Sequence, residues 1–529
     1  MFLITSILFF IWIIKNIFFW VSLWQIKEYR FDRLMLHFRE TLQGKNLFFS
    51  PLLFLKWIGI IGYIPVILNR SLTFSYDVFV LSIFTLQILI TLREVFERGI
   101  RRPAFTLKAL FIIGLTFSIL LLLLGFPLLD SFVWLLILDR LVPLFIFIFV
   151  TSFSLPTEFY YDIAISRGTK KIKARNDLVV IGVTGSYGKS STKEYIAQIL
   201  AKKFRVLKTQ GTNNTPIGIA RTIQEGLRKN TEIFVVEMGA YKRGEIAYMC
   251  QIVHPTIGVL TAVSDQHLSL FGSLENTREA KYELIQALPK DGLGLFNGNN
   301  KIAYDLYKHA LRRKILYKTS DSFVRVGADI FAYNIIPRKT HIAFDVVMKK
   351  RTMHLIAPLI GAQNVENILP GIFIGKSLGM TETDIKKAVS LLSPLPKTMN
   401  RHEFSNGLTI IDDTFNANPE AVIAAVSYMK LYKGKRILVL QPMIELGKNT
   451  KEEHYRIGKE ASAVCDYLFL TNKNFYEEVL EGARNGKGKS IVQVGSPKKI
   501  SQFINGETTK GDVVVFEGKE AGFVLDAIL

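Results

Sequence analysis

The residues with the clearest chemical potential form a short turn that contains two glycines, a lysine and several hydroxyl groups. They are Gly185, Ser186, Tyr187, Gly188, Lys189, Ser190 and Ser191. Glycines let backbone N–H groups close on a phosphate, a lysine can meet the outer phosphates of a nucleotide, and the hydroxyl after it is placed for Mg²⁺. The turn is one residue shorter than the usual phosphate-loop spacing, yet its residue types and their order predict an ATP site.

Such a turn needs a strand before it and a helix after it. Residues 177–183 form an apolar, β-branched run that predicts a buried parallel strand, and residues 190–201 have helical periodicity. An ordinary strand-to-helix turn is the alternative. Because a Gly-Lys-Ser triplet seldom has both flanking elements by chance, the phosphate loop is favoured.

Two further side chains follow predicted strands of the same sheet. Glu237 ends a strand predicted at 233–238, and His267 follows a strand predicted at 257–261. Ligands in parallel α/β sheets bind at the carboxyl ends of the strands, where a carboxylate can hold Mg²⁺ directly or through water. Taken alone, Glu237 could be a surface carboxylate and His267 a polar loop residue, but beside a phosphate loop both become metal-site candidates.

The chain from residue 177 onward alternates short apolar strands with helical runs, which predicts parallel sheets covered by helices. We expect an ATP-binding α/β domain at 177–395 and a smaller Rossmann-like α/β domain at 396–529. The first has strands including 293–296, helices at 216–228, 275–288 and 364–378, and a β-rich insert at 322–358. The second has strands at 408–411, 436–441, 467–470 and 513–516.

The N-terminal region predicts an α-helical membrane domain at 1–155. The whole chain is 49% apolar, and the apolar excess lies in five candidate spans at 2–24, 51–68, 72–92, 109–129 and 132–153. Residues 25–50 and 93–108 each hold five Lys or Arg, whereas the other two connections hold one and none. The positive-inside rule then places the N-terminus outside and everything after the basic linker 156–176 in the cytoplasm.

Four features of charge distribution and cysteine content limit the partners. The net charge of +21 is concentrated in part beside the spans, so anionic lipid head groups explain it better than nucleic acid. Residues 28–40 predict an amphipathic helix on the inner leaflet, with a solvated connector as the alternative. Asp139 and Arg140 either face the bundle interior or lie at an interface after a break near Pro143. Cys250 and Cys465 lack metal-ligand spacing and predict two reduced thiols.

Several segments together resemble the Mur ligase family, ATP-dependent enzymes that join a carboxylate to an amine while building the peptide of the bacterial cell wall. The resemblance covers about residues 177–529 and is greatest to the member that adds D-alanyl-D-alanine. The matching segments are TGSYGKSSTKE (184–194), GTNNTPIG (211–218), VVEMGAYKRGEI (235–246), HLSLFGSLENTREAKYELI (267–285), RHEFSNGLTIIDDTFNANPEA (401–421) and MIELGKNTKEEH (443–454).

The resemblance implies a role for each matching position. Lys189 and the loop amides would bind phosphates, Ser190 and Glu237 would hold a first Mg²⁺, His267 would hold a second, and Lys281 would become a carbamylated Mg²⁺ ligand. Lys189, Lys281 and His267 would thus be catalytic. The remaining implied contacts are to the adenine (Asn297, Asn364, Asn367), to the phosphates and ribose after domain closure (Arg401, Asp413), and to the substrates (Asn213, Asn214, Asn416, Asn418, Glu445), with a less clear role for His454.

The chain departs from the family pattern at several places. Ala262 stands for the usual Asn, Gln363 for His, and Glu517-Gly518-Lys519-Glu520 for Lys-Gly-Ser-Arg. The family's UDP-binding N-terminal domain gives way to the predicted spans. We therefore expect a multi-pass protein of the plasma or inner membrane whose acceptor is a cell-wall precursor that could be lipid-linked, and which could assemble with other cell-wall enzymes. The alternatives are a ligase for another polymer such as poly-γ-glutamate, and a non-catalytic Mur-like scaffold.

Overall fold

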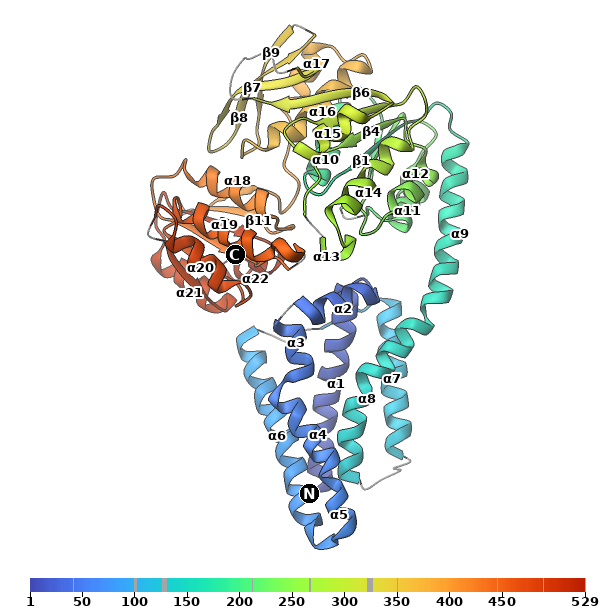
Figure 1. Cartoon of the computed structure of the whole chain (residues 1–529), viewed down its shortest axis with the longest axis vertical. Helices are drawn as coiled ribbons and strands as arrows, with labels where there is room; N and C mark the ends of the chain where they lie inside the picture. Colours follow the sequence, from blue (N-terminus) through green and yellow to red (C-terminus); the bar gives the residue numbers. More distant parts are fainter. Residues whose placement is uncertain are drawn as a thin grey trace. The chain divides into compact units, whose positions relative to one another are not determined.

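The computed structural model describes residues 1–40, 42–98, 102–125, 131–211, 213–265, 268–320, 327–349, 351–444, 446–488 and 490–528. The chain divides into two compact units, Met1–Tyr160 and Tyr161–Leu529 (Figure 1). The first unit is helical and the second consists of two α/β domains. Each unit is described by itself.

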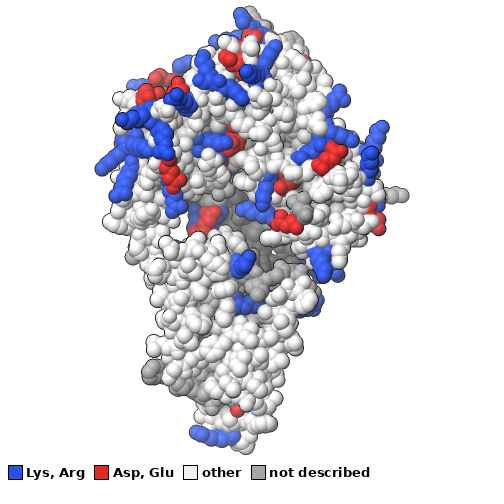
Figure 2. Space-filling view, turned by 180° about the vertical axis from the view of Figure 1, so that it is seen from behind, with Lys and Arg blue, Asp and Glu red and all other residues white. Residues whose placement is uncertain are grey.

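The first unit is built from helices of strongly apolar sequence. They are α1 (Phe2–Ile26), α2 (Phe31–Glu40), α3 (Leu42–Phe49), α4 (Pro51–Ile61), α5 (Tyr63–Leu68), α6 (Thr73–Arg98), α7 (Leu107–Gly125), α8 (Ser131–Ser152) and the start of α9 (Ser154–Lys173). Within the described residues, five helical stretches are long and apolar enough to cross a membrane. Figure 2 shows that one face of this unit carries almost no charged side chains. Both observations fit the predicted spans.

A polar cluster lies inside this apolar unit. The Asp139 carboxylate on α8 is fully buried and accepts hydrogen bonds from Trp12 (2.6 Å) and Asn16 (3.0 Å) on α1. It also pairs with Lys56 on α4 at 2.6 Å and with Arg140 at 2.5 Å. The helix continues through Pro143. Of the two interpretations of Asp139 and Arg140, the interior site is the one observed, and it ties three helices together.

The first α/β domain contains a nine-stranded sheet in the order β2-β3-β1-β4-β5-β6-β7-β8-β9. Strands β1 to β6 and the β6–β7 pair are parallel, whereas β7–β8 and β8–β9 are antiparallel. The strands are β1 (Val179–Thr184), β2 (Val206–Lys208), β3 (Ile233–Glu237), β4 (Ile257–Leu260), β5 (Leu293–Asn297), β6 (Arg313–Thr319), β7 (Ile330–Pro337), β8 (Ile342–Met348) and β9 (Arg351–Ala357).

Helices cover this sheet and make its core. They are α10 (Lys189–Leu200), α11 (Pro216–Gly226), α12 (Glu245–Val253), α13 (Leu268–Phe271), α14 (Leu274–Gln286), α15 (Lys301–His309), α16 (Asn364–Ser377) and α17 (Glu382–Val389). The apolar sides of α10 and α16 share one buried cluster with β1, β3 and β4. The expected helices at 216–228, 275–288 and 364–378 are confirmed to within two residues.

The structure adds to the sequence-based interpretation in three places, two within this sheet and one just before it. The predicted β-rich segment at 322–358 does contain the strands β7, β8 and β9, and they extend the main sheet from β6. Strand β6 itself was not predicted, since its sequence RKILYKT carries three charges around a short apolar centre. The segment 156–176, expected as a linker, is largely the helix α9.

The second α/β domain contains a six-stranded sheet in the order β10-β11-β15-β12-β13-β14, parallel except for the β10–β11 pair. Its strands are β10 (Asn400–Glu403), β11 (Thr409–Asp413), β12 (Arg436–Leu440), β13 (Tyr467–Leu470), β14 (Ile491–Val494) and β15 (Val513–Glu517). Its helices are α18 (Pro419–Met429), α19 (Thr450–Ser462), α20 (Tyr476–Arg484), α21 (Pro497–Glu507) and α22 (Lys519–Leu525).

Candidate functional site

The glycine-rich turn lies between β1 and α10, as predicted. Gly188 has a φ of +78° and occupies the N-cap position of α10, a left-handed conformation that glycine adopts without strain. The backbone N–H of Ser186 donates to the Ala262 carbonyl at 2.7 Å, and the Thr261 hydroxyl donates to the Tyr187 carbonyl at 2.5 Å. The loop is therefore fixed against the end of β4, at the N-terminus of a helix whose dipole favours an anion.

Gly185 is required by close packing rather than by the turn alone. A Cβ at this position would lie 2.1 Å from Oγ1 of Thr261 and 2.9 Å from the Ala262 backbone. Its φ of +153° also disfavours any other residue. This glycine therefore lets the loop approach β4 closely.

Lys189, the first residue of α10, folds back over the loop. Its Nζ donates to the Ser186 carbonyl at 2.9 Å. Burial lowers the pKa of the Lys189 ammonium, and the nearby carboxylate of Glu237 opposes that shift. Ser190 and Ser191 follow in the first turn of the helix. These positions match those expected of a lysine and hydroxyls beside the phosphates.

Glu237 ends β3 and is only 2% exposed. Its Oε1 accepts a hydrogen bond from Nδ2 of Asn214 at 3.0 Å, and its Oε2 lies 3.5 Å from Nζ of Lys193. No hydrogen bond reaches Oε2 from the part of the chain that the structure describes. A buried carboxylate oxygen without a donor, close to a phosphate loop, fits Mg²⁺, which prefers oxygen ligands.

Lys281 lies on α14 and is 2% exposed. Its Nζ donates to the Ala240 carbonyl at 3.3 Å and lies 5.2 Å from the centre of the Phe271 ring. Burial, with a smaller contribution from the Lys189 ammonium, lowers the pKa of Lys281 to about 7. A large fraction of its amine is therefore uncharged near neutral pH. Lys281 is therefore not a solvated lysine on the outer face of its helix.

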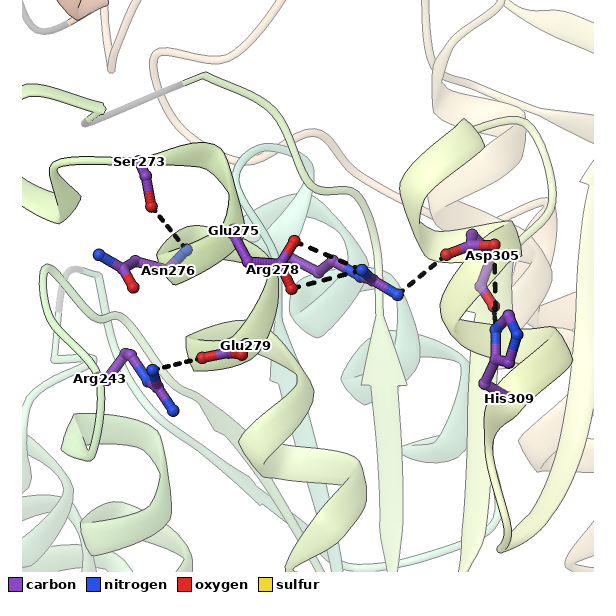
Figure 3. Close-up of polar contacts among 8 residues, drawn as sticks. All are labelled: Arg243, Ser273, Glu275, Asn276, Arg278, Glu279, Asp305 and His309. Carbon is purple, nitrogen blue, oxygen red and sulfur yellow. Dashed lines mark hydrogen bonds and ion pairs between the residues drawn. The ribbon is translucent and has the colours of Figure 1, made fainter.

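The helix that carries Lys281 is held by polar contacts along its exposed side (Figure 3). The Ser273 hydroxyl accepts from the Asn276 N–H at 3.1 Å and caps the helix. Arg278 bonds Asp305 of α15 at 2.9 Å, and Arg243 pairs with Glu279 at 2.5 Å. These contacts fix α14 to α15 and to the loop after β3, which sets the position of Lys281.

The three asparagines expected near the adenine come together around α10 and α16. The Asn364 side chain accepts from the Tyr195 hydroxyl at 3.1 Å, and Asn367 accepts from the Thr192 hydroxyl at 3.2 Å. Asn297, at the end of β5, donates to Glu366 at 2.9 Å. The three amides join α10 and β5 to α16 through hydrogen bonds. Their contact with the adenine stays a prediction.

The site residues expected from the C-terminal domain differ from one another in burial and in the contacts they make. Arg401 pairs with Glu403 at 2.5 Å, and its Nε donates to the Tyr432 hydroxyl at 3.4 Å. Asp413 is buried beside Glu517 on the neighbouring strand. The Asn418 side chain caps α18 by accepting from Ala421 at 3.0 Å, whereas Asn416 is exposed.

Other expected residues have structural contacts or lie outside the described residues. His454 is fully buried, accepts from the Met443 N–H at 3.1 Å and stacks on Phe475. Asn213 is exposed beside the half-buried Asn214. His267 and Glu445 lie outside the described residues. Among the residues described, no three His, Cys, Asp or Glu side chains form a metal-binding group.

Family models and relatives match the two α/β domains. The Mur ligase middle domain matches residues 183–375, and the Mur ligase glutamate ligase domain matches residues 399–520. The chain belongs to the Mur ligase family. The protein is thus an ATP-dependent ligase that joins an acid to an amino acid or peptide. The Mur ligase domains together contain the phosphate loop, Glu237 and Lys281.

Individual relatives agree with this assignment. The chain is 30% identical over 354 residues to the UDP-N-acetylmuramoyl-tripeptide–D-alanyl-D-alanine ligase of Bacillus subtilis, covering 66% of this chain and 75% of the relative. It is 29% identical to the ligase of the same name from Escherichia coli, over 54% of this chain and 62% of that one. The MurF ligase of Thermotoga maritima in complex with ADP superposes with a TM-score of 0.62 at 27% identity, covering 70% of this chain and 83% of that one.

Sequence reasoning missed several residues that shape the Mur ligase site. The Thr261 hydroxyl donates a hydrogen bond to the loop, and the Thr192 hydroxyl donates one to Asn367. Lys193 lies within ion-pair distance of Glu237. Lys193 follows Lys189 by four positions, which places both on one face of a helix. That spacing was the available signal, since the helix predicted at 190–201 contains Lys193 and begins directly after Lys189.

Proposed function

We propose that this chain is a membrane-anchored Mur ligase that adds D-alanyl-D-alanine or a similar amine to a peptidoglycan precursor peptide through an acyl phosphate. The observation that supports the proposal is that Lys189, beside the glycine-rich loop, interacts electrostatically with both Glu237 and Lys281. The similarity to ligases named for D-alanyl-D-alanine addition supports the choice of amine. The domain organisation 1–155, 156–176, 177–395 and 396–529 is part of this proposal.

The proposed reaction has two balanced steps. The acceptor carboxylate attacks the γ-phosphorus of ATP, which forms an acyl phosphate and releases ADP. The donor amine then attacks the acyl carbon, forms the amide and expels phosphate, while the amine gives up a proton. A carboxylate is a poor electrophile at neutral pH, so phosphorylation is what makes the second step feasible.

The chain's own residues would support these steps by charge and by position. The loop amides of 185–189 and the Lys189 ammonium would bind the phosphates, and this offsets the repulsion between two anionic reactants. Ser190 and Glu237 would hold Mg²⁺, which supplies further charge neutralisation when bound. Asn214 keeps the Glu237 carboxylate in place, and Asn213 beside it would meet the acceptor.

Lys281 suits the expected carbamylation because of its environment. CO₂ reacts with the uncharged amine, and burial keeps a large share of Lys281 uncharged near neutral pH. The uncharged amine forms an N–C bond to CO₂ and releases one proton, which turns a neutral amine into an anion able to bind Mg²⁺. His267 would complete the proposed second metal site. Arg401 and Asp413 would contact the nucleotide once the domains close.

The five apolar stretches support anchoring in the plasma or inner membrane, with the ligase domains in the cytoplasm where ATP is available. A bilayer around the five apolar stretches could present a lipid-linked acceptor to the ligase domains. Comparing turnover of a soluble UDP-linked peptide with that of a lipid-linked peptide in nanodiscs tests this. A preference for the lipid-linked peptide supports presentation by the membrane, and equal turnover of both contradicts it.

The ligase proposal itself is tested with the purified full chain. The protein in detergent receives ATP, Mg²⁺, a precursor tripeptide and D-alanyl-D-alanine, and amide product is followed by mass spectrometry. Amide formed in equal amount to ADP supports the proposal. Amide formed only with glutamate would favour a poly-γ-glutamate-type ligase, and nucleotide binding without amide from any amine would favour a scaffold.

A further inference from the structure

Lys193 is a completely buried lysine whose ammonium lies within ion-pair distance of two carboxylates. Its side chain is 0% exposed, and its Nζ makes no hydrogen bond to any residue that the structure describes. The Nζ lies 3.5 Å from Oε1 of Glu194 and 3.5 Å from Oε2 of Glu237. A buried ammonium is costly unless a carboxylate compensates it, so these two carboxylates account for its charge.

The charges around Lys193 alternate along a chain of four side chains. Lys208 of β2 pairs with Glu194, Glu194 with Lys193, and Lys193 with Glu237. The network is therefore electrically neutral. Within the described residues, Lys193 is the cation that lies within ion-pair distance of Glu237.

The two oxygens of Glu237 are held differently. Oε1 accepts a directed hydrogen bond from Asn214 at 3.0 Å, which fixes the carboxylate at the edge of the sheet. Oε2 meets Lys193 at a longer distance and without a hydrogen bond. The Asn214 contact is therefore positional, while the Lys193 contact is mainly electrostatic and can be exchanged for a stronger cation.

We propose that Lys193 is a positioning residue that serves as the counter-ion of Glu237 until Mg²⁺ binds, and that competes with Mg²⁺ for this carboxylate. The inference rests on the proposed function, because it takes Glu237 as a Mg²⁺ ligand. A buried carboxylate left without a cation would destabilise the metal-free protein. Once Mg²⁺ is bound, the Lys193 ammonium repels it, which limits Mg²⁺ affinity.

The test replaces Lys193 by an uncharged residue of similar size. Calorimetry measures Mg²⁺ binding to the full chain in detergent, saturated with ADP. Lys193→Gln should lower the Kd for Mg²⁺ by about tenfold, since one nearby positive charge is lost. The same variant should melt at a lower temperature than the wild type in EDTA, and Mg²⁺ with ADP should remove most of that difference.

Lys208→Gln is the matched control, because it removes a cation from the same network without touching Glu237. It should leave the Kd for Mg²⁺ unchanged. A merely structural role for Lys193 would lower the melting temperature of Lys193→Gln equally with and without Mg²⁺. That result, or Mg²⁺ binding by Lys193→Gln that is unchanged or weaker, overturns the inference.

A double variant covers the case in which Lys193→Gln does not fold. Lys193→Gln/Glu237→Gln leaves no uncompensated charge at Glu237, so it should fold and melt independently of Mg²⁺. Failure of both variants to fold would contradict the counter-ion role. Absence of Mg²⁺ binding by the wild type with ADP overturns both this inference and the proposed metal site. Wild-type binding that Glu237→Gln weakens and Lys193→Gln leaves unchanged overturns this inference alone.

Discussion

Asp413 and Glu517 are register partners on the parallel strands β11 and β15, and both carboxyl groups are buried. Apart from Asp413 itself, no described residue donates a hydrogen bond to the Glu517 carboxyl. Burial raises the pKa of Asp413 to about 7 and that of Glu517 well above its usual range. Since two adjacent buried carboxylates repel each other strongly, the pair holds a proton at neutral pH.

This pair should make the stability of the C-terminal domain depend on pH. The folded pKa lies above the unfolded one, so the folded state binds the proton more tightly, and stability falls as pH rises from about 4 to about 7 and beyond. In Glu517→Gln the amide carries no charge, so the variant should gain about 1–3 kcal/mol at pH 8 and less at pH 5. Urea unfolding at both pH values measures this.

Glu403→Gln is the control for that experiment, because Glu403 is an exposed carboxylate that pairs with Arg401 on the same sheet. It should keep the pH slope of the wild type. If Glu517→Gln also keeps that slope, the shared proton does not exist.

Lys281→Met should reduce amide formation by about 100-fold or more, because it removes the group proposed to become a Mg²⁺ ligand. Short-chain carboxylic acids should restore part of the activity by supplying a carboxylate. In the wild type, activity should fall in CO₂-depleted buffer and rise with pH through about 7, where the pKa of Lys281 leaves more of the amine uncharged. A carbon-13 carbamate signal that is absent from Lys281→Met would identify the site, and full activity of the variant would exclude it.

Gly185→Ala should weaken ADP binding by about tenfold or more, because the new methyl group would meet Oγ1 of Thr261 at 2.1 Å and push the loop away from β4. Gly506→Ala is the control, since its Cβ would point into open space on α21. Equilibrium binding of a fluorescent ADP analogue measures both variants. Equal affinity of the two would mean that the loop does not hold the nucleotide.

Asp139→Asn should destabilise the helical unit by about 3–5 kcal/mol, because it leaves the buried Lys56 and the neighbouring Arg140 without their carboxylate. Glu94→Gln, which removes the more exposed partner of Lys15, should cost less than about 1 kcal/mol. Unfolding of the two variants in detergent, followed by circular dichroism, compares them. Similar losses would show that the Asp139 cluster does not hold the helices together.

The sequence predicted the elements whose patterns are local. The phosphate loop between strand and helix, β3 ending at Glu237, and β13 at 467–470 follow from short apolar runs and adjacent glycines. β6 and β10 escaped prediction because charged residues interrupt them, and only pairing within a sheet makes them strands.

The contacts between distant segments could not be read from the sequence. Whether Asp139 faces the bundle interior depended on Trp12 and Asn16 of another helix. Similarly, Glu517 differs from the family lysine, but its pairing with Asp413 required the register of β11 and β15. The burial that lowers the pKa of Lys281 likewise depends on how α14 packs, which its sequence alone does not specify.

The most direct measurement follows oxygen from the acceptor to phosphate. The full chain is given ATP, Mg²⁺, D-alanyl-D-alanine and a precursor peptide whose terminal carboxylate carries oxygen-18, and the released phosphate is analysed by mass spectrometry. An acyl phosphate predicts one oxygen-18 atom in each phosphate released, in equal amount to the amide. Phosphate that contains only unlabelled oxygen, with or without ADP release, would contradict ligation through an acyl phosphate.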